Sequence, residues 1–115
     1  MSRFVALIVE DDAAQRDTLA HLLRGEGPEV VECATGASAE LVLVSTGPEL
    51  RALVADLDLG EGRHSGLELA QYAKRNFPAL NVVVVSGREP PYVPKDTCFF
   101  MKPYEPQELL DAILR

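Results

Sequence analysis

The chain has 115 residues and a formal net charge of −7, from 18 acidic and 11 basic side chains, and this balance argues against nucleic-acid binding through a basic face. Its apolar runs are all far shorter than the roughly 18 residues that a membrane span needs. The first run, residues 4–9, is too short for a signal peptide and leads directly into three acids. We therefore expect one cytoplasmic domain over residues 1–115, with no output domain.

Strands and helices alternate along the chain. Residues 4–9 form a continuous apolar run, which predicts a strand buried on both faces. A helix follows from Asp12, which has capping-box spacing to Gln15, and ends near Gly25. Further strands are expected at residues 30–33, 53–56, 82–86 and 98–101, and further helices at residues 36–46, 66–77 and from Pro106 onward. This alternation predicts a parallel sheet with right-handed crossovers.

The connection between the last two predicted strands, residues 87–97, breaks this alternation. It contains three prolines, at positions 90, 91 and 94, and an interior proline costs a helix about 3 kcal/mol. We expect the fourth helix to be absent or very short. The sheet face beside residues 82–85 should then be thinly covered, so we expect a partner, or a second copy in a homodimer through residues 87–101, to cover it.

Polar groups follow four of the predicted strands, and parallel strands point their carboxyl ends at one edge of a sheet. These groups are Glu10-Asp11, Asp56, Ser86 and Lys102. Carboxylates about 5 Å apart repel by roughly 3 kcal/mol at an effective dielectric near 20, so such a cluster must protonate or hold a cation. Hard carboxylate oxygens suit Mg²⁺, while a lysine and a hydroxyl suit phosphate oxygens. Together these groups predict phosphoryl transfer to an aspartate.

At this point the chain resembles the response-regulator receiver domains of two-component signalling. The matching motifs cover nearly the whole chain in order: Val9-Glu10-Asp11-Asp12, Asp56 within residues 54–59, Gly66-Leu67-Glu68-Leu69, Ser86-Gly87 and Lys102-Pro103-Tyr104. The resemblance implies a flavodoxin-like, doubly wound α/β fold with five parallel strands in the order 2-1-3-4-5. It also implies that Asp56 accepts a phosphoryl group from the phosphohistidine of a sensor histidine kinase.

The resemblance further implies the roles of the site residues. Asp11 would bind Mg²⁺ directly and Glu10 mostly through water. Asp56 and the backbone carbonyl of Asp58 would complete the metal site, while the Asp58 side chain reads equally well as a solvated loop acid. Ser86 and Lys102 would contact the phosphoryl oxygens.

Further expectations concern the switch and the surroundings of the site. Phe99 falls where the family carries a switch aromatic that works with Ser86, although the short connection puts the usual coupling in doubt. The Lys102-Pro103 bond should be cis, as in relatives. Gly87 should leave the phosphoryl group open to water, and Arg88 could partly shield it. The loop of residues 60–65 carries extra residues beside the site.

Two other interpretations remain open. The chain could be a pseudo-receiver, an interaction module that is never phosphorylated. Asp56-Leu57-Asp58-Leu59 also resembles the first motif of haloacid-dehalogenase-like phosphatases, but there the paired acids follow the nucleophile. On the receiver interpretation the chain is no enzyme beyond Mg²⁺-dependent self-phosphorylation and autodephosphorylation. Its partners would be the kinase and a histidine phosphotransferase or another protein target.

Overall fold

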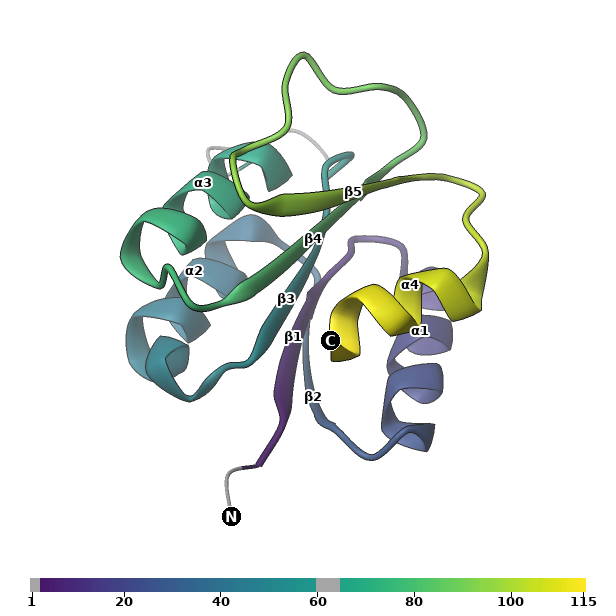
Figure 1. Cartoon of the computed structure of the whole chain (residues 1–115), viewed down its shortest axis with the longest axis horizontal. Helices are drawn as coiled ribbons and strands as arrows, with labels where there is room; N and C mark the ends of the chain where they lie inside the picture. The colour runs from purple at the N-terminus through teal and green to yellow at the C-terminus, as the bar shows by residue number, and fades with distance from the viewer. Residues whose placement is uncertain (1–2, 60–64) are drawn as a thin grey trace.

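Five parallel strands form one sheet in the computed structural model, which describes residues 3–59 and 65–115. The strand order is β2-β1-β3-β4-β5, as predicted (Figure 1). The strands are β1 (Val5–Val9), β2 (Glu29–Cys33), β3 (Ala52–Asp56), β4 (Asn81–Ser86) and β5 (Thr97–Met101). The helices are α1 (Ala13–Gly25), α2 (Gly36–Thr46), α3 (Gly66–Asn76) and α4 (Pro106–Leu114), with a short 3₁₀ turn η1 (Gly47–Glu49).

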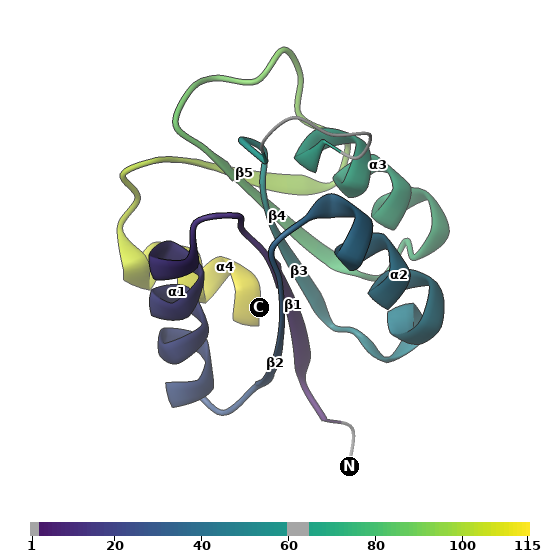
Figure 2. The same cartoon turned by 180° about the vertical axis from the view of Figure 1, so that it is seen from behind.

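The helices cover both faces of the sheet, with α1 and α4 on one face and α2 and α3 on the other (Figures 1 and 2). Successive strand residues point to opposite faces, so each inner strand contributes to two separate cores. In β4, for example, Val82 and Val84 pack with α2 and α3, whereas Val83 and Val85 pack with α1 and α4. This explains why the inner strands are continuously apolar.

Short polar residues begin three of the helices. The Asp12 carboxylate accepts a hydrogen bond from the Gln15 amide at 2.9 Å, which confirms Asp12 as the N-cap of α1. Thr35 and Ser65 cap α2 and α3 in the same way. Among the described residues, no helix has the length and apolar character needed to cross a membrane.

The connection from β4 to β5, residues 87–96, contains no helix, so the predicted loss of that element is confirmed. It arches away from the carboxyl ends of the strands and returns beside α3 (Figure 1). The expected thin cover lies over β5 and not over β4. Val82 to Val85 are at most 4% exposed because α3 and α4 reach across the inner strand. On β5, Phe99 is half-buried and Met101 is 45% exposed.

Candidate functional site

The predicted site residues converge at the carboxyl edge of the sheet. Asp56 ends β3 and Ser86 ends β4, while Glu10 and Lys102 directly follow β1 and β5. The strands are in register there, with Asp56 opposite Val85. Asp56 is 3% exposed, Ser86 2% and Glu10 6%, so three polar groups are buried at this edge of the sheet. Such groups are costly unless they are hydrogen-bonded, and each one is.

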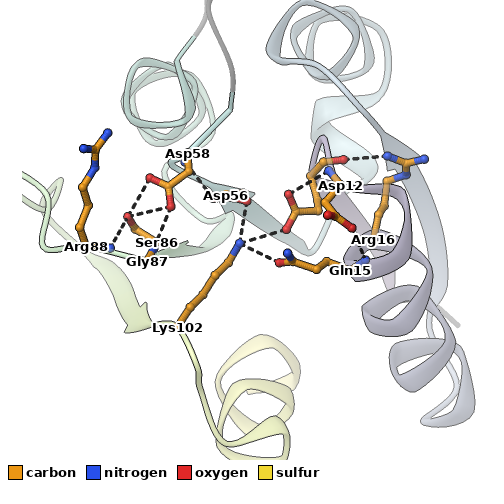
Figure 3. A network of polar contacts seen from close by, with 10 residues as sticks. Asp12, Gln15, Arg16, Asp56, Asp58, Ser86, Gly87, Arg88 and Lys102 are labelled. Atoms are coloured by element: carbon orange, nitrogen blue, oxygen red, sulfur yellow. Dashed lines mark hydrogen bonds and ion pairs between the residues drawn. The ribbon is translucent and has the colours of Figure 1, made fainter.

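The Lys102 ammonium joins the two sides of the site (Figure 3). Its Nζ atom lies 2.8 Å from Asp56 Oδ2 and 3.2 Å from Glu10 Oε1. It also donates to Gln15 Oε1, in the first turn of α1, at 2.9 Å. The sequence did not predict this role of Gln15, and its position just after the acidic run was the only signal for it. One cation therefore compensates two buried carboxylates.

The two carboxylates have opposite protonation tendencies. Burial, and then the hydrogen bond and charge of Asp56, raise the pKa of Glu10 to about 7. Burial alone would raise the pKa of Asp56, but hydrogen bonds from Glu10 and Lys102 outweigh it and leave that pKa below its usual value. Burial likewise opposes the charge of Lys102, but Asp56 and Glu10 more than offset it and raise its pKa. As the pH falls, the first proton taken up by this pair therefore goes to Glu10 and not to Asp56.

The acids fit a hard divalent cation. One carboxylate oxygen each from Glu10, Asp11 and Asp56 lies within 4.8 Å of the others. Asp11 is exposed, so the cluster opens to solvent and leaves room for water ligands. Oxygen donors with space for water are what Mg²⁺ requires. The structure therefore brings together the three predicted side-chain ligands.

The Asp58 side chain is a second polar centre, on the other side of Asp56. Its carboxylate accepts hydrogen bonds from Ser86 Oγ at 3.1 and 3.2 Å and from the Gly87 amide at 2.8 Å (Figure 3). Ser86 Oγ in turn accepts from the Arg88 amide at 3.2 Å. The Arg88 guanidinium points away from Lys102 in Figure 3. Asp58 is therefore hydrogen-bonded across the site, and is not simply a solvated loop acid.

The start of α3 presses directly on the backbone of Asp56. A Cβ atom placed on Gly66 would lie 2.2 Å from the Asp56 carbonyl oxygen and 2.7 Å from Leu57 Cα. Only a glycine allows this approach without a shift of the backbone. Gly66, the first residue of the Gly66-Leu67-Glu68-Leu69 motif, thus allows α3 to pack closely behind Asp56. The neighbouring loop, for which extra residues were noted, lies largely outside the described residues.

Two further predictions concern β5 and the residue after it. The Lys102-Pro103 peptide bond is cis, as predicted. Phe99 packs against the core formed with α2 and α3, and it pairs in register with Val84. It lies two residues before Met101, the register partner of Ser86, and therefore on the same face of β5 as Met101. Its role as a switch stays a prediction.

Residues 6–114 match the response regulator receiver domain family. With the fold and the carboxyl-edge cluster described above, this match defines the class of the protein. The chain belongs to the receiver domain family of two-component response regulators.

Similar proteins support this assignment. The chain is 34% identical over 108 residues, 93% of its length, to a response regulator receiver protein of Anaeromyxobacter sp. strain Fw109-5, and it covers 43% of that protein. It is 30% identical over 98% of its length to nodulation protein W of Bradyrhizobium diazoefficiens, of which it covers 51%. The chain thus spans about half or less of these curated relatives.

Solved structures show the same fold. A response regulator receiver domain protein from Methanospirillum hungatei matches with a TM-score of 0.82 at 26% identity, over 96% of this chain and 90% of that one. A response regulator receiver protein from Sinorhizobium medicae has a TM-score of 0.89 at 22% identity, over 97% and 92% of the two chains. At 22% identity, the second match is evidence for the fold and not for the function.

Proposed function

We propose that this chain is a phosphoryl-accepting signalling protein, in which Asp56 takes a phosphoryl group from the phosphohistidine of a sensor histidine kinase. The observation that supports the proposal most strongly is the burial and ion pairing of Asp56. It is a buried carboxylate, ion-paired to Lys102 at 2.8 Å, at the sheet edge where Glu10 and Asp11 also gather. A nucleophile must be ionised and fixed in place, and this pairing supplies both conditions.

In the proposed step, an Asp56 carboxylate oxygen forms a bond to phosphorus while the bond from phosphorus to the donor imidazole nitrogen breaks. The electron pair of that bond returns to the imidazole, and the product is an acyl phosphate. Glu10, Asp11, Asp56 and the backbone carbonyl of Asp58 would hold Mg²⁺, which when bound neutralises charge on the phosphoryl oxygens. The Lys102 ammonium and the Ser86 hydroxyl would donate to those oxygens.

Acetyl phosphate tests this proposal without knowledge of the kinase. The protein is incubated with acetyl phosphate and Mg²⁺, and its intact mass is measured. We expect the wild type to gain one phosphoryl group and Asp56→Asn to gain none, because the amide is not nucleophilic. An Asp111→Asn variant, altered on the exposed face of α4, serves as the matched control and should be modified like the wild type. No gain in the wild type would instead favour an interaction module.

The proposal extends to partners and to location. A sensor histidine kinase would supply the phosphoryl group, and a histidine phosphotransferase or another protein would receive the signal, in the cytoplasm.

We also propose a homodimer through residues 87–101. Its support is the exposure of large apolar side chains there: Tyr92 is 47% exposed, Val93 41% and Met101 45%. Apolar patches of this kind mark contact surfaces.

A further inference from the structure

The hydrogen-bond donors at the end of β4 already have an anionic partner. The Ser86 hydroxyl and the Gly87 amide both point to the Asp58 carboxylate, at 3.1 and 2.8 Å. These donors lie beside Asp56 and are of the type that a phosphoryl oxygen requires. The carboxylate therefore holds donors that the phosphorylated protein would need.

The surroundings of Asp58 make this contact specific. Its amide donates to Asp56 Oδ1 at 2.8 Å, which ties the Asp58 backbone to the proposed phosphoacceptor. A Cβ atom added to Gly87 would lie 3.6 Å from Asp58 Oδ2, so this position faces the carboxylate and has room for no more than ordinary contact. In the described part of the chain no lysine or arginine forms an ion pair with Asp58. Asp58 is exposed, and the protein groups that hydrogen-bond its carboxylate are Ser86 and Gly87.

We propose that Asp58 is a gating residue: its carboxylate occupies the Ser86 and Gly87 donors in the unphosphorylated protein and competes with the incoming phosphoryl group for them. The inference rests on the proposed function of Asp56. A phosphoryl group on Asp56 would bring further negative oxygens beside the Asp58 carboxylate. These like charges would repel one another. Asp58 must release both donors before they can serve the phosphoryl group.

The gate predicts faster phosphorylation when the carboxylate is removed. Hydrogen bonds to a charged group are stronger than neutral ones, so breaking them first should slow the reaction by roughly 10-fold. Asp58→Ala removes the acceptor altogether. Asp58→Asn keeps one oxygen acceptor but removes the charge, so its rate should fall between those of Asp58→Ala and the wild type.

The experiment measures the rate of phosphoryl gain from acetyl phosphate at saturating Mg²⁺, by intact mass, for the wild type and both variants. Saturating Mg²⁺ keeps a change in metal affinity from altering the rate. Glu89→Gln removes one charge from an exposed position of the β4–β5 connection and is the matched control, with an expected rate equal to that of the wild type. A second series at high salt separates the contact from long-range repulsion, which salt screens.

A second measurement needs no phosphoryl donor. Amide hydrogen exchange at Gly87 reports its hydrogen bond to Asp58, and it should become faster in Asp58→Ala and remain unchanged in Glu89→Gln. Equal Gly87 exchange in the wild type and Asp58→Ala would overturn the gate, because the carboxylate would then not hold that donor in solution.

The rate outcomes separate the two proposals. If the wild type is phosphorylated and Asp58→Ala is equally fast or slower, the gate is wrong and the role of Asp56 stands. If only the Asp58 variants are phosphorylated, the gate is supported in its strongest form. If no protein gains a phosphoryl group, the proposed function fails and the gate fails with it. A rate gain that disappears at high salt would also overturn the gate in favour of general repulsion.

Discussion

The carboxyl edge of the sheet and the β4–β5 connection lie next to each other but are built in opposite ways. At the edge, Asp56 and Ser86 are nearly fully buried, and each buried side-chain nitrogen or oxygen atom among the described residues has a hydrogen-bond partner. In the connection, Tyr92 and Val93 are largely exposed and no helix forms. The comparison teaches that the acids, the hydroxyl and the lysine keep their places although no helix joins β4 to β5.

The largest expected effect comes from breaking the edge itself. Lys102→Met leaves the Asp56 and Glu10 carboxylates without their cation, and removing one partner of a buried ion pair costs about 3–5 kcal/mol. Because Lys102 is itself partly exposed, we expect a loss of about 2–4 kcal/mol in the free energy of unfolding, measured by urea denaturation without Mg²⁺.

The control for this change is Lys95→Met, in the connection, where the side chain is exposed. A surface substitution of this kind should change the free energy of unfolding by no more than about 0.5 kcal/mol. Equal losses in the two variants would show that the edge is no more dependent on its lysine than the connection is.

The packing of α3 behind the site gives the next largest effect. In Gly66→Ala the new methyl group would meet the Asp56 carbonyl oxygen at 2.2 Å, and backbone must move to relieve the contact. Overpacking of this kind costs about 1–3 kcal/mol, which thermal or urea unfolding would show. Gly25→Ala, with nothing within 4 Å of its Cβ, should be neutral or slightly stabilising. A tolerated Gly66→Ala would mean that α3 does not pack so closely in solution.

A smaller effect should appear in the pH dependence of the metal-free protein. The pKa of Glu10 is about 7 in the folded chain against an ordinary value of 4.5, so the folded state holds an extra proton between these pH values. Its contribution to stability is therefore complete below pH 4.5 and is lost as the pH rises through about 7. The lowered pKa of Asp56 acts at lower pH and leaves this interval to Glu10.

We expect the free energy of unfolding to fall by about 2 kcal/mol between pH 5 and pH 8 without Mg²⁺ because of this group. Urea titrations across that range would measure the fall. Glu10→Gln should show a flatter profile, since the amide cannot lose a proton. Parallel profiles in the two proteins would argue that Glu10 is already ionised at pH 5. Saturating Mg²⁺ should also flatten the wild-type profile, because a bound cation displaces the proton.

The sequence predicted the edge well because each of its anchors directly follows an apolar run. Strand ends position Asp56, Ser86 and Lys102, and parallel pairing brings them together whatever the helices do. The prolines of the connection likewise predicted the missing helix. These features depend on the local sequence pattern and on the rule that parallel strands end at the same edge of a sheet. Both can be applied from the sequence alone.

The contacts that the sequence did not reveal are side-chain choices across long separations. Gln15 reaches Lys102 across 87 residues and Asp58 reaches Ser86 across 28. Nothing local favours these partners over water, since Gln15 and Asp58 are exposed residues. The thin cover was placed over β4 because the prediction could not tell how far α3 and α4 extend over the sheet. The exposed face is found one strand outward, at Met101.

The smallest expected change in stability comes from a substitution in the β4–β5 connection, which instead tests self-association. Tyr92→Ser alters a side chain that is 47% exposed, so the free energy of unfolding should change by no more than about 0.5 kcal/mol. If residues 87–101 form the proposed homodimer, the same change should weaken self-association, because aromatic side chains dominate the energy of protein interfaces. Sedimentation over a series of protein concentrations would measure this. Leu41→Ser, on α2 and 72% exposed, is the matched control and should leave association unchanged. A wild type that remains monomeric at every concentration, or equal weakening by both variants, would rule out the connection as the dimer surface.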